Sequence, residues 1–548
     1  MIGRFLAFEN KPVATAVQAT LLIFLMAAVV GIRTTGRKRS RKIKSSKQAS
    51  SSPSDFQEGP ALTPEEEEDI IAKWVSKPLV PKKTAKATTT SPTGNVVIHS
   101  IVRGTAYVMA DILEGTPTPA SNSPPKKILN MASFDFLGVG TGSCHRPDED
   151  DSSATSSDPV QTAARSALRT YGVGSCGPRG FYGTVGPAHL ALESAMASAC
   201  AVDTSILYSD ACAASTSAVA AFCKRGDVIV VDEAVCQPLA DGVRLSRSYV
   251  RTFRHNDMED LERVLKEIKE DDERNGRKQE ERRRFIVAEA VYRSTGRLLP
   301  LKKLVELKGP YGYRLILDEA ASFGVLGDNG GGLTESCGLG YCAPDVEIAI
   351  ISLEHAMSTI GGMVVGDTDV IDHQRLSGAG YCFSASNPPF FAFVGQASLG
   401  MLRGDDGRRA REKLRHNMKV TADSIEKHLK DTAKIVSDIG SPLVFVMLED
   451  CSIDKIARDG ANMMQVQTNF WRQVARTVLV KDNILMVAVA GNNAKPPSKF
   501  SRSMPSCPTF PSIRMTITAS QTEEDICRAV LALKETVKEI LTSGLEMQ

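Results

Sequence analysis

The chain has 548 residues, and its 66 basic residues nearly balance its 64 acidic ones. This length can bury a large hydrophobic core without disulfides or structural metals, and the balanced charge argues against a nucleic-acid-binding protein and against an acidic disordered chain. The 12 cysteines include no C-x-x-C pair and no zinc-ligand spacing, so we expect reduced thiols and no metal site.

The first predicted element is a transmembrane helix within residues 1–35. Residues 13–32 contain no charged side chain, and a helix of that length spans a bilayer core of about 30 Å. Residues 33–47 follow with eight basic and no acidic residues, which predicts that the bulk of the chain is cytosolic. A cleaved signal peptide is the alternative, because the most apolar run has only about a dozen residues.

Residues 36–125 are predicted to form a tether that is largely disordered. Residues 36–65 are rich in Ser, Lys and Arg, and residues 77–127 are rich in Pro, Thr and Ser. A short helix is expected after Thr63, where acidic residues fill the first turn. An apolar patch at 96–109 also interrupts the tether.

Residues 126–400 alternate short apolar runs with helical periodicity, which predicts a three-layer α/β/α domain around a mostly parallel sheet. The expected strands are 228–231, 285–290, 314–320 and 346–351, and the expected helices are 187–201, 211–224, 258–270 and 300–308.

Residues 401–548 have a different texture and predict a smaller α+β domain. The expected helices are 403–432, 463–478 and 522–542, and the expected strands lie near 442–448, 483–489 and 512–517.

Five segments of the large domain occur in the order known from one enzyme family. They are YGVGSCGPRGFYGT (171–184), KRGDVIVVDEAVCQPLADG (224–242), FRHNDMEDLE (253–262), LDEAASFGVLG (317–327) and HQRLSGAGYCFSASNPP (373–389). Together they resemble the α-oxoamine synthases, which are pyridoxal phosphate (PLP) enzymes of fold type I. The family includes the heterodimeric serine palmitoyltransferases, and the first and last segments most resemble the subunits that lack the catalytic lysine. The resemblance implies a fold type I PLP-transferase-like large domain.

The resemblance also implies that the catalytic positions of this chain are degenerate. A lysine must form the Schiff base with PLP, and its place falls on His355 in SLEHAMSTIGG, with no lysine in 309–412. The family's ring-stacking histidine falls on Cys236, and a second histidine near the cofactor falls on Ala321. Asp318 remains at the place that faces the ring nitrogen, as a vestigial residue.

Two segments are expected to meet a partner subunit, because fold type I active sites lie at a dimer interface. The first is the glycine segment (171–184), where Arg179 could meet an anionic group; a tight turn that packs the interface is the alternative. The interface residues expected here are Tyr171, Gly174, Arg179, Tyr182 and Cys236; for Cys236 a buried inert thiol is the alternative.

The second is the serine loop (383–389), where the resemblance implies that Ser384 and Ser386 donate hydrogen bonds to the phosphate of the partner's PLP. A loop that caps the following helix is the alternative for this segment.

The resemblance implies a non-catalytic subunit of an acyltransferase that condenses L-serine with palmitoyl-CoA. A lysine-bearing catalytic subunit would hold the PLP, and this chain would complete its site and anchor it, as a single-pass protein, to the endoplasmic reticulum membrane. Small regulatory membrane subunits are a further class of expected partner, and nucleic acid is not expected. The alternatives are a self-sufficient α-oxoamine synthase and a membrane scaffold without enzymatic function.

Overall fold

The computed structural model describes residues 95–113, 124–144, 158–174, 177–278, 281–456, 462–491 and 510–543. The predicted membrane segment within residues 1–35 lies outside these ranges. Among the residues inside them, no helix is both long and apolar enough to cross a membrane.

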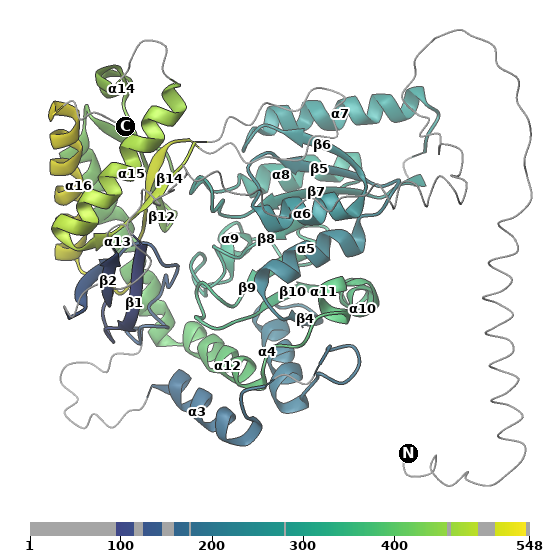
Figure 1. The fold of residues 1–548 in the computed structure, drawn as a ribbon. Coiled ribbons are helices and arrows are strands. Elements are labelled where there is room, and N and C mark those ends of the chain that lie inside the picture. The colour runs from purple at the N-terminus through teal and green to yellow at the C-terminus, as the bar shows by residue number, and fades with distance from the viewer. Residues whose placement is uncertain are drawn as a thin grey trace, which may run out of the picture. The chain divides into compact units, whose positions relative to one another are not determined.

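A seven-stranded sheet forms the centre of the larger part of the molecule (Figure 1). Its strand order is β4–β10–β9–β8–β7–β5–β6, and only β10 runs antiparallel to its neighbours. Every residue of β5, β7, β9 and β10 is buried, as continuous apolar runs predict for a sheet covered on both faces. The strands are β4 (Thr204–Tyr208), β5 (Val228–Asp232), β6 (Tyr249–Phe253), β7 (Arg284–Glu289), β8 (Arg314–Asp318), β9 (Ile348–Ser352) and β10 (Gly362–Gly366).

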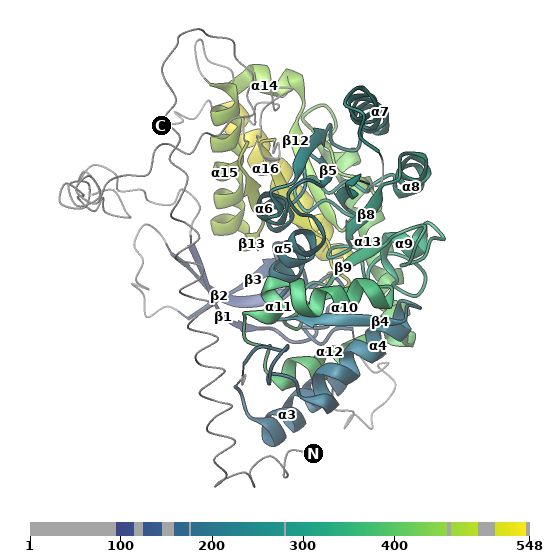
Figure 2. The same cartoon turned by 90° about the vertical axis from the view of Figure 1, so that its right-hand side faces the viewer.

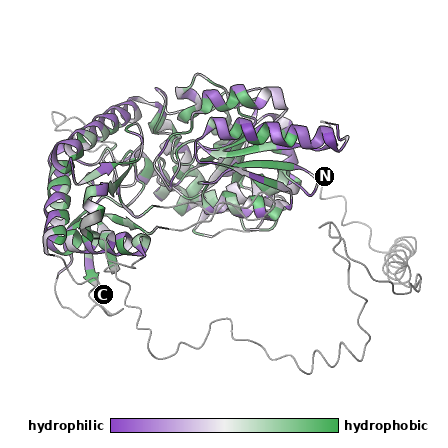
Figure 3. Cartoon of the chain, turned by 90° about the horizontal axis from the view of Figure 1, so that it is seen from above, coloured by the Kyte–Doolittle hydropathy of each residue, from purple (hydrophilic) through white to green (hydrophobic). Residues whose placement is uncertain are grey.

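Helices cover both faces of this sheet. Figure 2 shows α5 (Ala211–Phe222) and α6 (Gln237–Ser246) on one face, with α7 (Met258–Arg274) and α8 (Leu301–Lys308) on the other. The chain reverses its direction across the sheet after β6, and right-handed crossovers then place the following helices on the opposite face. In Figure 3 the central strands are hydrophobic and α7 presents hydrophilic residues on its outer side.

The remaining helices of this part connect or flank the sheet. They are α3 (Pro159–Tyr171), η2 (Gly186–Leu190), α4 (Ala191–Ala199), η4 (Gly309–Tyr311), α9 (Gly332–Ser336), α10 (Thr368–Ser377), α11 (Ala379–Cys382) and α12 (Pro389–Arg403).

The predicted three-layer architecture is confirmed. The four predicted strands correspond to β5, β7, β8 and β9, and the four predicted helices correspond to α4, α5, α7 and α8. The strands β4, β6 and β10 are additional. In β10 the run GMVVG is bounded by two glycines, and a run this short carries little sequence signal.

The second part contains two four-stranded sheets. One has the order β11–β12–β15–β14 and packs against α13 and α15, and α16 packs against these two helices, which matches the predicted α+β pattern. Its elements are α13 (Asp405–Leu429), β11 (Ala433–Ile435), β12 (Leu443–Leu448), α14 (Asp450–Ile456), α15 (Met463–Asp482), β14 (Val487–Val489), β15 (Ser512–Thr516) and α16 (Glu523–Ser543).

The other sheet corrects the predicted tether over 36–125. Residues 95–113 form an antiparallel hairpin of β1 (Asn95–Ile101) and β2 (Tyr107–Leu113). β2 pairs with β3 (Lys126–Asn130), which pairs in parallel with β13 (Ile484–Leu485). The apolar patch at 96–109 therefore forms part of this sheet, and buried Val108 packs with Ile128 and Leu479.

The predicted division at residue 400 falls inside α12, near its end. The described residues between 95 and 543 belong to one compact unit. The boundary between a large and a small domain therefore stays a prediction.

Candidate functional site

Four strands of the central sheet reach the same edge with a polar or charged residue. β5 ends at Asp232, β7 at Glu289, β8 at Asp318 and β9 at Ser352. Glu289 and Asp318 are register partners on neighbouring parallel strands. Ligands of open α/β sheets bind outside the carboxyl ends of the strands, so this edge holds the candidate site.

The Asp318 carboxylate is fully engaged within the chain. Its side chain is buried, and Oδ1 accepts a hydrogen bond from the backbone N–H of Ala320 at 2.8 Å. Oδ2 accepts from the Ser215 hydroxyl on α5 at 3.2 Å and from a guanidinium nitrogen of Arg293 at 2.9 Å. The anion that the resemblance assigns to a ring nitrogen is thus paired with a cation of its own chain.

Arg293, which the sequence motifs do not single out, contacts two predicted site residues, Asp318 and Cys236, and also Glu289. Its Nε lies 3.0 Å from Oε2 of Glu289, and the nitrogen that meets Asp318 also donates to Sγ of Cys236 at 2.8 Å. The backbone N–H of Cys236 donates to Oε1 of Glu289 at 2.6 Å. We call Glu289, Arg293, Asp318 and Cys236 the arginine cluster.

Burial determines the protonation of this cluster. It raises the pKa of Glu289 to about 7, against the opposing effect of Arg293, and raises the pKa of the Cys236 thiol well above its ordinary value. The Cys236 thiol is therefore neutral. Its hydrogen bond to Arg293 places it inside the cluster, so the expected role at a subunit interface is not supported.

His355 occupies the lysine position directly after β9, and its ring is buried. Its Nδ1 lies 2.8 Å from the carbonyl oxygen of Ala320, so Nδ1 carries the hydrogen and donates it. The ring also meets Phe134 edge-on at 5.0 Å between centroids. Burial, aided by the charge of Arg293, lowers the pKa of His355 to about 4, which keeps the imidazole neutral. Nearby Ala321 is buried and contributes only a methyl group.

The N-terminus of α5 points at the same edge, and carboxylates of this chain cover it. Oδ1 of Asp210 accepts from the backbone N–H of Ala213 at 2.7 Å, and Oε1 of Glu354 accepts from the N–H of Ala211 at 3.4 Å. Free N–H groups at a helix N-terminus attract phosphate. Two carboxylates at this terminus instead repel an added anion.

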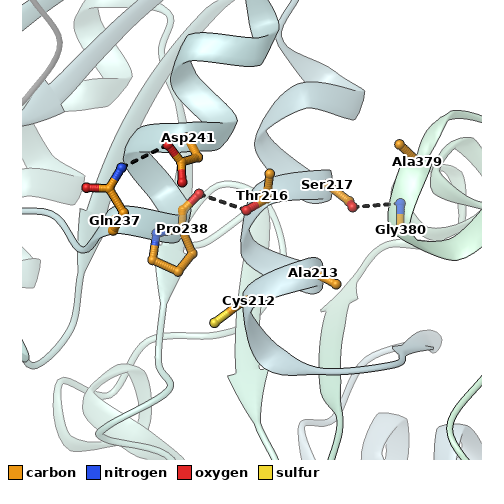
Figure 4. Close-up of a pocket in the computed structure, with 9 residues that line it drawn as sticks. All are labelled: Cys212, Ala213, Thr216, Ser217, Gln237, Pro238, Asp241, Ala379 and Gly380. Atoms are coloured by element: carbon orange, nitrogen blue, oxygen red, sulfur yellow. Dashed lines mark hydrogen bonds between the residues drawn. The ribbon is translucent and has the colours of Figure 1, made fainter. Parts of the chain in front are cut away.

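An open hollow of about 460 Å³ borders α5, α6 and α11 (Figure 4). Its polar groups are largely bonded to one another: the Thr216 hydroxyl donates to the Pro238 carbonyl oxygen at 3.0 Å, and Gln237 donates to Asp241 at 2.8 Å. No basic side chain lines it, so the hollow offers no counter-charge for a phosphate.

Arg179 does not have the predicted role of meeting an outside anion. Its side chain is 3% exposed and lies 3.0 Å from Oε1 of Glu193 on α4. It also donates to the Thr184 hydroxyl at 3.0 Å and to the Leu207 carbonyl oxygen at 3.3 Å. Arg179 therefore anchors the glycine segment to the body of the protein.

The serine loop packs against the glycine segment. The backbone N–H of Ser386 donates to the Gly177 carbonyl oxygen at 2.9 Å. His189 accepts from the Val185 N–H through Nδ1 at 3.0 Å, so its Nε2 donates to the Asn387 carbonyl oxygen at 3.0 Å. The two predicted segments thus form one surface.

Neither predicted serine hydroxyl is presented to a partner in this structure. The Ser384 hydroxyl donates to the Gly380 carbonyl oxygen, and Ser386 is buried. A hydroxyl that donates inside its own chain must break that bond before it can donate to a phosphate. The expected contact with the partner's cofactor is therefore not supported by this arrangement.

The joint surface of the two segments carries exposed apolar side chains instead. Phe181 is 72% exposed and Phe383 is 81% exposed, and Tyr182 and Gly174 are also exposed. Tyr171 is half-buried and stacks on Phe393 of α12 at 5.5 Å. Of the predicted interface residues, Gly174 and Tyr182 are thus available to another chain, with Phe181 and Phe383 in addition.

Comparison with known proteins identifies the family. Residues 149–533 match the family described as Aminotransferase class I and II. The chain is 33% identical to Long chain base biosynthesis protein 1 of Arabidopsis thaliana, over 88% of this chain and 86% of that protein. It is 36% identical to Serine palmitoyltransferase 1 of Dictyostelium discoideum, over 72% and 75%. This chain belongs to the serine palmitoyltransferase 1 family.

Solved structures confirm the fold expected for this family. A serine palmitoyltransferase from Sphingomonas wittichii matches 87% of this chain and 96% of its own, with a TM-score of 0.61 at 20% identity. At this identity the likeness shows the fold alone, which is the predicted PLP fold type I.

The residues at the cofactor position of this serine palmitoyltransferase 1 family member do not fit PLP. The lysine place holds a buried histidine, His355, whose ring is hydrogen-bonded to Ala320. The partner of the ring nitrogen, Asp318, is bonded to Arg293, and the helix terminus suited to a phosphate is covered by Asp210 and Glu354. Each charged feature of the cofactor would meet a position that the chain has already filled.

Proposed function

We propose that this chain is the non-catalytic subunit of serine palmitoyltransferase. The reaction is the decarboxylative condensation of L-serine with palmitoyl-CoA to 3-ketosphinganine, the first step of sphingolipid synthesis. The observation that carries the proposal is the closed cofactor position: His355 replaces the lysine, and Arg293 pairs with Asp318. A chain of this family without its own PLP site contributes through another chain.

The partner in this proposal is the lysine-bearing long-chain-base subunit 2, which holds the PLP and the catalytic groups. The contact surface is formed by the glycine segment and the serine loop. Exposed aromatic side chains such as Phe181 and Phe383 are typical of the central contacts of protein interfaces. The buried ion pair of Arg179 with Glu193 holds this surface in place for the partner.

The proposal includes anchoring at the endoplasmic reticulum membrane. Residues 13–32 form an uncharged segment, and residues 33–47 add eight basic side chains that favour the cytosolic face. The chain would be single-pass with its bulk in the cytosol, where it holds the catalytic partner close to the membrane and meets any small regulatory membrane subunits.

Co-expression tests this function. Membranes from cells without endogenous activity are prepared with this chain alone, with the lysine-bearing subunit alone and with both, and 3-ketosphinganine formation from L-serine and palmitoyl-CoA is measured. Activity is expected only with both chains. Full activity of the lysine-bearing subunit alone would support a scaffold, and activity of this chain alone would support a self-sufficient synthase; each result would overturn the proposal.

A further inference from the structure

The arginine cluster places one cation between two buried carboxylates. Glu289 and Asp318 each have a side chain that is 1% exposed, and Arg293 contacts both, at 3.0 and 2.9 Å. A buried carboxylate without a partner is costly, so these strand ends require a cation or protonation. The chain supplies that cation from the loop that follows β7.

The Arg293 guanidinium meets Asp318 in the way that a protonated pyridine ring would: both are planar cations that direct an N–H at the carboxylate. In PLP enzymes a carboxylate pairs with the ring nitrogen of the cofactor. The guanidinium is also a planar cation with an N–H directed at a carboxylate oxygen, here Oδ2 of Asp318. It differs from the ring because it is attached to the chain and also binds Glu289 and Cys236.

We propose that Arg293 is a permanent internal occupant of the cofactor position, in which its guanidinium replaces the protonated ring as the counter-ion of Asp318. Asp318 then serves as the counter-ion of Arg293 and not of a cofactor. The carboxylates of Asp210 and Glu354 at the N-terminus of α5 extend the same pattern, since they occupy the place suited to a phosphate. The chain thus keeps the fold rigid by filling the position from within.

Chemical rescue tests this inference in the full-length chain in detergent. Arg293→Ala leaves two buried carboxylates unpaired and opens a space at Asp318, so the melting temperature is expected to fall by about 5–10 °C. Millimolar methylguanidinium should restore much of this loss in a saturable manner, because it can refill the space. The matched control is Arg297→Ala, since Arg297 is exposed and lies 3.9 Å from Asp438. Its melting temperature should equal that of the wild type and should not change when methylguanidinium is added.

A second variant keeps the test decisive if Arg293→Ala does not fold. The triple variant Arg293→Met, Glu289→Gln, Asp318→Asn removes the charges together, and it should fold, melt close to the wild type and ignore methylguanidinium. An Arg293→Ala variant that melts like the wild type would overturn the inference. So would a triple variant as unstable as the single one. The readout is the stability of this chain, so the outcome is independent of the proposed activity with a partner.

Discussion

Two regions of the molecule differ in what their side chains contact. The cofactor position is filled by side chains that bond to one another, and the joint surface of the glycine segment and the serine loop exposes aromatic rings. At the cofactor position, Asp318 is buried and is bonded to Arg293, whose side chain is half-buried. At the joint surface, the only described arginine of the glycine segment is buried as an anchor, and the aromatic rings of Phe181 and Phe383 are left exposed. One region is closed on itself and the other is open to another chain.

This difference separates what the fold has lost from what it still offers. A pocket that is filled by its own side chains cannot bind a ligand of the same charge pattern. A rigid surface with exposed aromatic residues retains the features of an interface. This contrast is what the proposed role as a platform for a partner requires, and the predictions below test each half of it.

The largest effect is expected at the anchor of the open surface. Glu193→Ala leaves the Arg179 guanidinium buried without its carboxylate, and this should cost about 3–5 kcal/mol in the free energy of unfolding. Denaturant unfolding of the purified chain measures the loss. The control is Asp372→Ala, because Asp372 is exposed and its ion pair with the half-buried Arg375 should contribute under about 1 kcal/mol. Equal losses in the two variants would contradict the anchoring role.

The closed position should show two opposite pH dependences. Burial raises the pKa of Glu289 from 4.5 to about 7, so the folded protein retains a proton that the unfolded chain releases, and this contribution to stability falls as the pH rises from about 4.5 to 7. Burial lowers the pKa of His355 from 6.5 to about 4, so the unfolded chain takes up a proton that the folded protein excludes, and stability falls as the pH drops from about 6.5 to 4.

Single variants separate these two effects. Separation is needed because the charges of Arg293 and Asp318 act on both Glu289 and His355. Relative to the wild type, His355→Gln should gain up to about 3 kcal/mol in stability as the pH is lowered from 6.5 to 4, because it no longer suffers the histidine loss. Glu289→Gln should gain a similar amount relative to the wild type as the pH is raised from 4.5 to 7. Denaturant unfolding at each pH measures both, and flat differences from the wild type would contradict the described burial.

The open surface should respond in binding and not in stability. Phe181→Ala and Phe383→Ala each remove an exposed ring, so the free energy of unfolding should change by less than about 0.5 kcal/mol. Binding of the lysine-bearing subunit should weaken by about 10- to 100-fold, as measured by titration of the two purified chains. Ile439 is also exposed but lies outside both segments, so Ile439→Ala should bind like the wild type. Weakening by all three changes would refute a specific surface.

The smallest effect concerns the serine loop. Ser384→Ala removes the hydrogen bond to the Gly380 carbonyl oxygen and should cost about 1 kcal/mol in stability. The affinity of the complex for PLP, followed by absorbance during titration, should stay unchanged. A clear loss of PLP affinity would instead show that this hydroxyl turns toward the partner's phosphate.

The central strands could be predicted because their signal is local. Runs such as FIVAEA and RLILDEA are apolar over their whole length, and they form β7 and β8. The arginine cluster could not be predicted in the same way. It depends on the register that pairs Glu289 with Asp318 and on a loop that turns Arg293 back across the strand ends. A partial signal was present, because Glu289 interrupts an apolar buried strand.

The candidate site shows the same limit. Comparison of motifs located His355, Cys236, Ala321 and Asp318, since each depends only on its place along the chain. The burial of Arg179 depends on Glu193 from another element, and the internal hydrogen bond of Ser384 depends on the fold of α11. The hairpin within 95–113 pairs through β2 with β3, and β3 in turn pairs with β13, which lies more than 350 residues further along the chain. This completion of the sheet from a distant segment leaves no local signal in the sequence.

Borohydride trapping tests the central claim most directly. The complex of this chain with the lysine-bearing subunit is reduced with borohydride in the presence of PLP, and the two chains are separated and analysed by peptide mass spectrometry. The account predicts a pyridoxyl label on a lysine of the partner and an unlabelled copy of this chain. A stoichiometric label on a lysine of this chain would contradict the claim that its cofactor position is closed.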